Sequence, residues 1–243
     1  MGITTRRRVG ALAAVGALAA ASAVGLVPAG SAGAAGAGVI QVPSDFVPSL
    51  SDTRPTGHYE VQGTGLRIFT EGSTSTDKVA EYVATSTPLA DVGEPTLDYT
   101  VASGGRPGFQ LVVDFDADGT NDGILVGETV YGNDWWLSNS AKPFVKDGAP
   151  SHSPGFGSAN HGTLDGWRAA FPAATVKAFG FSLGSGVKGD GVISAINFAG
   201  TRYTFAKDVV LTGKEECKKG GWETSTKPVF KNQGECVSSF ARG

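Results

Sequence analysis

Short β-rich runs, each closed by turn residues, are the feature of this chain that most restricts its fold. Val, Ile, Phe, Tyr and Thr dominate these runs, and Gly, Asp or Pro separates them. Nine runs are predicted strands: residues 58–62, 66–70, 79–84, 97–102, 109–115, 124–131, 175–183, 192–198 and 202–205. Many short strands at close spacing predict an all-β, two-sheet sandwich.

Helical signals are scarce and support the same fold class. Residues 38–243 contain 29 of the 36 Gly residues, which is about twice the usual share of ~7%. One segment, residues 163–171, has a helical pattern with Thr163 as its cap and Pro172 after its end. Because strands do not alternate with long helices, a parallel α/β sheet is not expected. We therefore expect a sandwich with one short helix.

The first 37 residues have the three parts of an export signal. Arg6, Arg7 and Arg8 form a basic start, residues 9–27 are apolar, and residues 29–37 are small. Two A-x-A cleavage sites lie in the last part, at Ala32 and Ala34 and at Ala35 and Ala37. The sequence therefore predicts a secreted, extracellular protein whose signal peptide covers residues 1–37.

The apolar run also has two alternative interpretations. It approaches the ~20 residues that span a bilayer, but it is mostly Ala and Gly and has a cleavable flank, so no membrane span is expected in the mature protein. The Arg6-Arg7 pair resembles a twin-arginine signal. The general and twin-arginine export routes both stay open.

The rest of the chain divides into three predicted parts. Residues 38–56, with Pro43, Pro48 and Pro55, form an irregular lead-in; residues 57–211 form the sandwich; residues 212–243 form a small appendage. Without residues 1–37 the chain has 17 Lys and Arg against 23 Asp and Glu, a formal charge of −6. An acidic chain without basic clusters is a poor partner for nucleic acid or anionic lipid.

Residues 114–122 are the strongest candidate for a chemical site, because acidic side chains alternate between two predicted strands. We expect Asp114, Asp116, Asp118 and Asp122 to bind a structural Ca²⁺, with Thr120 adding its backbone carbonyl. The loop lacks the closing Glu of an EF-hand. The alternative is a metal-free turn whose Asp side chains accept hydrogen bonds from their own backbone. Repulsion among four carboxylates favours the cation.

Tyr131, Trp135 and Trp136 are candidate ligand-binding residues, since exposed aromatic faces beside polar groups suit sugar rings. Neighbouring residues in a strand point to opposite faces, so one of the two indoles should enter the core. The other is expected either to form a ligand platform or to make an ordinary half-buried contact.

Ser182 lies in a G-x-S-x-G pattern, which in α/β-hydrolases marks the nucleophile. That role needs a helix after the Ser and a His later in the chain. Gly-rich residues 185–191 disfavour the helix, and the last histidine is His161. Ser182 is therefore predicted to be a residue of a strand end. His58, His152 and His161 have no zinc-binding spacing, and no catalytic residues are predicted.

The last 30 residues contain the two cysteines of the chain, Cys217 and Cys236. In an exported protein two isolated cysteines are expected to form a disulfide. The pattern C-K-x-G-G-W followed by F-K-N-Q-G-x-C-V resembles a recurrent C-terminal appendage of secreted bacterial proteins, and the match covers residues 216–238. No activity follows from this match.

Residues 58–205 carry a second resemblance, to jelly-roll proteins secreted by actinobacteria. It rests on residues 65–68, the acidic loop with residues 124–126, Trp135-Trp136 and residues 184–196. The resemblance implies a jelly-roll-like sandwich related in shape to carbohydrate-binding modules. It transfers no catalytic residues.

The sequence leaves three function classes open. The first is a non-catalytic binding module that recognises polysaccharide or a cell-wall component. The second is a glycan-active hydrolase with a carboxylate pair, and the third is a purely structural surface protein. Two facing carboxylates in a cleft would favour the enzyme, whereas an exposed Trp face would favour the binder.

Overall fold

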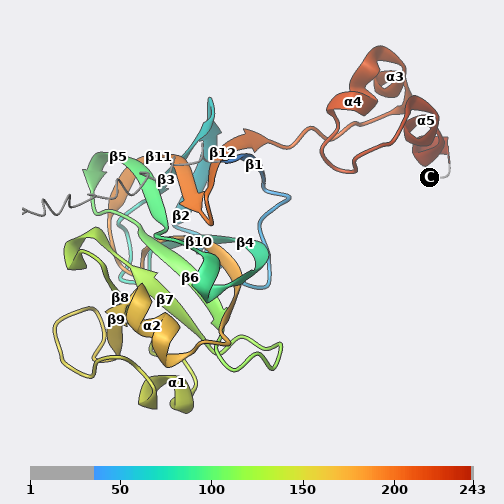
Figure 1. Cartoon of the computed structure of the whole chain (residues 1–243). Coiled ribbons are helices and arrows are strands. Elements are labelled where there is room, and N and C mark those ends of the chain that lie inside the picture. The colour runs from blue at the N-terminus through green and yellow to red at the C-terminus, as the bar shows by residue number, and fades with distance from the viewer. Residues whose placement is uncertain (1–35, 242–243) are drawn as a thin grey trace, which may run out of the picture. The chain divides into compact units, whose positions relative to one another are not determined.

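The computed structural model describes residues 36–241, which form a two-sheet β-sandwich and a small helical appendage (Figure 1). The first sheet contains β1 (Gly36–Val42), β2 (Gly57–Gln62), β3 (Gly65–Thr70), β5 (Thr96–Gly104), β11 (Gly189–Phe198) and β12 (Thr201–Lys207). The second contains β4 (Lys78–Pro88), β6 (Gly108–Asp114), β7 (Gly123–Gly127), β8 (Asp134–Leu137), β9 (His161–Thr163) and β10 (Thr175–Gly184). The predicted all-β, two-sheet sandwich is confirmed.

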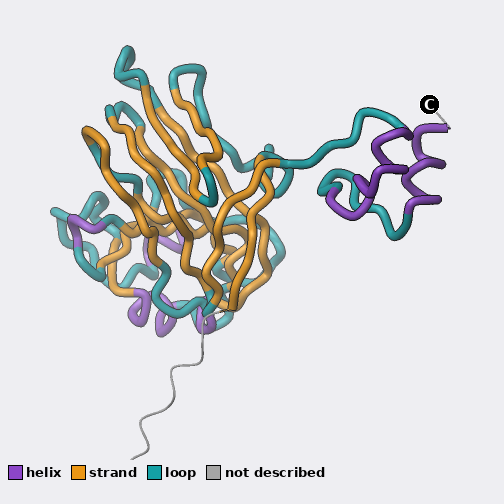
Figure 2. The backbone as a smooth tube through the Cα atoms, turned by 90° about the horizontal axis from the view of Figure 1, so that it is seen from above, coloured by secondary structure: helices purple, strands orange, loops and turns teal. Residues whose placement is uncertain are grey.

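The two sheets are connected differently. The second sheet has the order β4-β10-β6-β7-β8-β9, and each neighbouring pair is antiparallel. In the first sheet β11 is central, because β5 pairs along one of its edges while β3 and β12 share the other. β2 continues the sheet beyond β3, and β1 pairs in parallel with β12. The strands of both sheets are the orange segments of Figure 2.

The core lies between the sheets, where inward-facing side chains of both meet. The Phe179 ring of β10 stacks on the Phe198 ring of β11, with centroids 4.2 Å apart. Every residue of β6 is buried, since neighbouring strands flank it and both of its faces are covered. Burying one large apolar side chain stabilises a fold by about 1.5–3 kcal/mol. This layer is therefore the main source of stability.

The segment after β1 runs along the free edge of β4 and reaches the outer face of the second sheet. The backbone amides of Val47 and Asp52 donate to the carbonyls of Tyr82 and Ala80 in β4, at 2.8 and 3.0 Å. Leu50 packs on the small apolar cluster on that face. The predicted irregular lead-in over residues 38–56 is thus wrong for its first five residues, which belong to β1.

Strand β1 also bears on the predicted signal boundary. It begins at Gly36, so the last two residues of the predicted signal, 36 and 37, pair with Thr201 and Arg202 of β12. A cut after Ala34, at the other A-x-A site, would leave this strand whole. Residues 1–35 lie outside the described part of the chain.

Short elements account for the other differences from the predicted strands. β8 and β9 were not predicted, because strands of four and three residues carry almost no alternating pattern. The strand predicted over residues 124–131 ends at Gly127, and a 3₁₀ turn, η2 (Thr129–Tyr131), follows it. A second 3₁₀ turn, η1 (Leu89–Asp91), follows β4.

Two short helices cover one end of the second sheet near β8 and β9 (Figure 1). Helix α2 (Leu164–Ala170) lies where the sequence predicts it, and the Thr163 hydroxyl caps it by accepting from the Gly166 amide. Helix α1 (Pro143–Asp147) was not predicted, since five residues are too few for a helical period. The Trp167 indole is fully buried and donates to the Trp135 carbonyl at 3.0 Å, which fixes α2 on β8.

The C-terminal appendage is helical and has a small core of its own. It contains α3 (Lys214–Glu216), the kinked turn η3 (Cys217–Gly221), α4 (Trp222–Thr224) and α5 (Gln233–Ala241). Cys217 and Cys236 form the predicted disulfide and are buried with Phe230. Within residues 36–241 no helix is long and apolar enough to cross a membrane.

Asp77 is a buried carboxylate at the start of β4, with 1% of its surface exposed. Its Oδ1 accepts from the Thr56 hydroxyl at 2.5 Å, and from the hydroxyl and amide of Thr74 at 2.6 and 3.2 Å. These hydrogen bonds, from Thr56 first, favour the ionised form and lower the pKa of Asp77 to about 2 from its ordinary 3.8.

Asp77 should make stability depend on pH in the acid range. Because its pKa is lower in the folded state, its contribution is present above about pH 4 and is lost as the pH falls towards about 2. We expect Asp77→Asn to lower the free energy of unfolding at neutral pH, and the difference from wild type to shrink in acid. Urea unfolding at neutral pH and near pH 3 measures both differences. A pH-independent difference would assign the loss to packing instead.

Candidate functional site

Strand β8 directs its two Trp side chains to opposite faces of the second sheet. Trp135 is only 5% exposed and packs edge to face on Phe109, with centroids 5.9 Å apart. Trp136 is half-buried on the other face, where its Nε1 donates to the Glu128 carboxylate at 3.1 Å. One indole therefore enters the core, as the alternation of strand residues requires.

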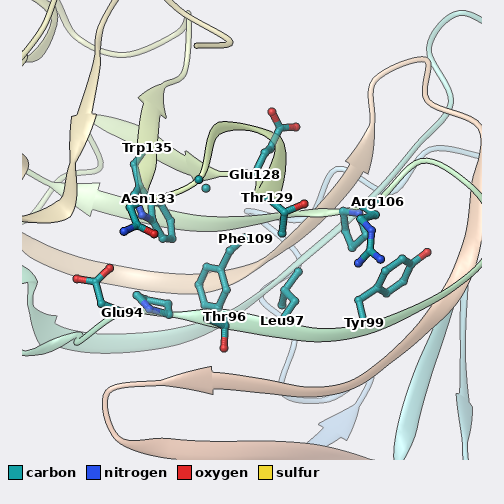
Figure 3. Close-up of a pocket in the computed structure, with 14 residues that line it drawn as sticks. Glu94, Thr96, Leu97, Tyr99, Arg106, Phe109, Glu128, Thr129, Asn133 and Trp135 are labelled. Atoms are coloured by element: carbon teal, nitrogen blue, oxygen red, sulfur yellow. The ribbon is translucent and has the colours of Figure 1, made fainter.

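Trp135 forms a wall of a cavity of about 270 Å³ beside β5 and β8 (Figure 3). The strands β5 and β6 and the turns around η2 supply the rest of it. The apolar lining is Pro95, Leu97, Tyr99, Pro107, Phe109 and Trp135, and the polar lining is Glu94, Thr96, Arg106, Glu128, Thr129 and Asn133. Such a mixture of apolar walls and a few polar groups is typical of small-molecule sites.

The charged groups of the cavity differ in the ion pairs and hydrogen bonds that they form with other residues. Glu128 accepts from Trp136, and Glu94 pairs with Arg168 at 3.2 Å. Arg106 is exposed and forms no ion pair with any residue between 36 and 241. Burial raises the pKa of Tyr99, which keeps its hydroxyl neutral. Arg106 is thus the charged group most available to a ligand.

No family model, curated protein or solved structure matches this chain. Its function is therefore inferred from the geometry of its own residues.

Tyr131 and Trp136 do not line the cavity that Trp135 lines. The Tyr131 ring lies 6.0 Å from the Phe156 ring, in the loop of residues 151–160. That loop also covers Trp136, since a Cβ on Gly157 would lie 2.7 Å from the indole. The three predicted ligand aromatics are thus divided between two faces of the sheet.

The acidic loop between β6 and β7 brings three of its four carboxylates together. Asp114, Asp116 and Asp122 each place one oxygen so that all three lie within 4.8 Å of one another. Asp114 and Asp122 are 2% exposed. Oδ1 of Asp114 is buried and accepts no hydrogen bond from the described residues. This unused oxygen is a ligand atom that a cation would satisfy.

The same loop contains the hydrogen bonds of the metal-free alternative. The Gly119 amide donates to Asp114 at 2.9 Å, and the Phe115 amide donates to Asp122 at 2.6 Å. Asp118 stands outside the group of three and accepts from the amide and hydroxyl of Thr120. Asp118 and Thr120 therefore stabilise the turn itself.

Lys142, which was not predicted from the sequence, reaches the acidic loop. Its Nζ lies 2.5 Å from Oδ1 of Asp122 and 2.8 Å from the Thr120 hydroxyl. The hydrogen bond to Asp122 raises the pKa of Lys142. Repulsion among the carboxylates is thus partly relieved by a cation of the protein, and an incoming metal ion would compete with it.

Ser182 lies within β10, between β4 and β6, and is 5% exposed. Its hydroxyl donates to the Gly184 carbonyl at 3.4 Å. A turn and then β11 follow β10, so the G-x-S-x-G segment lacks the strand–turn–helix shape of a nucleophile elbow.

Three charged residues of the cavity, Glu94, Arg106 and Glu128, were not predicted from the sequence. They lie in different turns, and the pairing of β6 with β7 and of β5 with β11 positions those turns. No local sequence signal distinguishes them from the other charged residues of the chain.

Proposed function

We propose that the chain is exported and that its sandwich recognises a polysaccharide or a cell-wall component through the cavity beside Trp135. The observation that carries this proposal is a concave site with aromatic walls and an exposed guanidinium, that of Arg106, at its rim. A sugar ring packs its C–H face on an aromatic wall, and its hydroxyls bind charged and amide groups. The signal-like N-terminus and the disulfide support an extracellular location.

A binding role is favoured over glycan hydrolysis with a carboxylate pair. The cavity does contain two carboxylates, but both already have partners. Glu128 accepts a hydrogen bond from the Trp136 indole, and Glu94 forms an ion pair with Arg168. The Glu94 side chain is 66% exposed. A glycosidase acid needs an apolar environment that keeps it protonated near neutral pH, and an exposed, ion-paired Glu94 lacks that environment.

The acidic loop supports a structural Ca²⁺ as a further part of the proposal. Asp114, Asp116 and Asp122 would hold the ion, and the buried Oδ1 of Asp114 is the observation that favours it. The ion would fix the turn between β6 and β7, two strands that run beside the cavity. Its role would be architectural.

Arg106→Ala tests the cavity as the binding site. Titration calorimetry of the secreted protein against a panel of soluble bacterial and plant cell-wall oligosaccharides would first find a ligand. We then expect Arg106→Ala to weaken its binding about tenfold, which corresponds to about 1.4 kcal/mol for a hydrogen bond to a charged group. Arg202→Ala, an exposed Arg on β12 paired with Asp98, is the matched control and should bind as wild type.

Two results would contradict the proposal. One is a panel in which no oligosaccharide binds. The other is a bound oligosaccharide whose affinity is the same for wild type and Arg106→Ala, because that result would place its site elsewhere.

A further inference from the structure

A serine, a histidine and an aspartate form a hydrogen-bonded chain on the face of the second sheet opposite the Trp135 cavity. Nδ1 of His161 lies 2.9 Å from Oδ1 of Asp134, and Nε2 lies 2.9 Å from the Ser153 hydroxyl. The aspartate is 27 residues before the histidine, and the serine is eight residues before it. In a catalytic triad the nucleophile contacts the general base, and the base contacts the acid that orients it. The three residues here make contacts in the same order.

Strand pairing holds the base and the acid in place. β8 and β9 are antiparallel, with Trp136 opposite His161 and Asp134 opposite Thr163. The His161 side chain is 5% exposed and the Asp134 side chain 17%. The Phe156 ring stacks on the imidazole at 4.2 Å, with planes 19° apart. The imidazole is therefore fixed between a strand and an aromatic ring.

The hydrogen bonds define the roles of the two ring nitrogens. Asp134 offers only acceptor oxygens when ionised, so Nδ1 of His161 donates and carries the proton. Nε2 then has a free lone pair, which accepts a hydroxyl proton. That is the tautomer a general base requires.

Two hydroxyls approach Nε2, and their exposure separates their roles. Ser151 lies 3.0 Å from Nε2 and 3.0 Å from the Ser153 hydroxyl, and it is half-buried. Ser153 is exposed to solvent. A nucleophile must reach a substrate, so Ser153 fits that role, and Ser151 is a positioning residue within hydrogen-bond distance of Ser153 and Nε2.

We propose that Ser153, His161 and Asp134 form a hydrolytic site that cleaves carboxylic esters, an activity beyond the proposed binding function. Ser153 Oγ attacks the ester carbonyl carbon and its proton moves to Nε2 of His161. The C–O bond to the alcohol breaks, Nε2 returns the proton to the departing alkoxide, and an acyl group remains on Ser153. Water then attacks the acyl group through His161, which releases the acid and restores Ser153.

The exposure of Ser153 also indicates the size of the substrate. Ser153 and its neighbours His152 and Pro154 are all exposed, so the nucleophile lies on a surface loop. A surface nucleophile favours an ester carried by a large molecule over a small ester that must be enclosed. An acyl substituent on a polysaccharide belongs to this class.

The test combines covalent labelling with ester hydrolysis by the secreted protein. We expect a fluorophosphonate probe to label Ser153, identified by mass spectrometry of the modified peptide. We expect Ser153→Ala to abolish the labelling and to lower hydrolysis of p-nitrophenyl acetate and of an acetylated polysaccharide by a hundredfold or more. Ser182→Ala, the serine of the G-x-S-x-G pattern, is the matched control and should leave both readouts unchanged.

A second measurement distinguishes loss of the catalytic contact from misfolding. It is needed because His161 and Asp134 also stabilise the fold. In Ser153→Cys the neighbouring imidazole should speed alkylation of the new thiol by iodoacetamide about tenfold or more, relative to the same thiol in Ser153→Cys with His161→Gln. Circular dichroism checks that both variants fold. An unlabelled Ser153 in folded wild type, or equal alkylation rates in the two folded cysteine variants, would overturn the proposal.

Discussion

Replacing Cys217 and Cys236 with serine is expected to unfold the C-terminal appendage and leave the sandwich folded. The longest helix of the appendage has nine residues, and isolated helices shorter than about 12–15 residues are marginal in water. Its core has three buried residues, two of which are the cysteines themselves. Closing a loop with a sequence separation of 19 residues stabilises a fold by about 3 kcal/mol on the chain-entropy estimate. Without the disulfide, the burial of side chains in so small a core does not provide a stabilisation of that size.

Limited proteolysis followed by mass spectrometry measures this effect. In the double variant we expect rapid cleavage after residue 212, while residues 36–207 stay protected. Reductant should reproduce the cleavage in wild type and have no further effect on the double variant. Equal protection of the appendage in wild type and variant would show that its helices are stable without the disulfide.

Calcium is expected to raise the melting temperature of the protein by about 5–10 °C relative to the chelated sample. An ion that binds only the folded state at ~100 times its dissociation constant adds about 2.7 kcal/mol. A chain of this size melts about 2–4 °C higher for each added kcal/mol. Asp116 is exposed in the loop, so Asp116→Ala should remove the response to calcium without weakening the core.

Lys142→Met makes this experiment more specific, because the ammonium of Lys142 pairs with Asp122, one of the three carboxylates that would hold the ion. If calcium binds at Asp114 and Asp122, removing the competing ammonium should raise the calcium affinity and enlarge the shift. Asp147→Ala, an exposed aspartate of α1, is the matched control for Asp116→Ala. Suppose that the chelator leaves the melting temperature unchanged and that Lys142→Met lowers the stability. These two results together would show a metal-free turn that Lys142 stabilises.

The sandwich could be predicted from the sequence because the signals that indicate it are local. β3 and β10, for example, combine β-branched and aromatic residues with a Gly at one end. Helix α2 was found from its Thr163 cap and the Pro172 that follows it. The disulfide followed from two isolated cysteines. Each of these signals lies within a few residues of the element that it specifies.

The short elements were missed because they depend on partners. β8 and β9 have four and three residues, and they form strands because each completes the hydrogen bonds of a neighbour. β1 was missed since its Gly-rich sequence adjoins the predicted signal, and its pairing with β12 joins residues at the two ends of the sandwich.

The candidate sites divide in the same way. By itself the sequence determined that Asp114, Asp116 and Asp122 share one turn, because alternation along a short loop is a local property. The approach of Lys142 to that turn was decided only by the tertiary structure, where its amide binds the Asp122 carbonyl at 2.8 Å. The contact of Asp134 with His161 likewise depends on the register of β8 against β9. Register is set by packing of the whole sheet, so no spacing in the sequence encodes it.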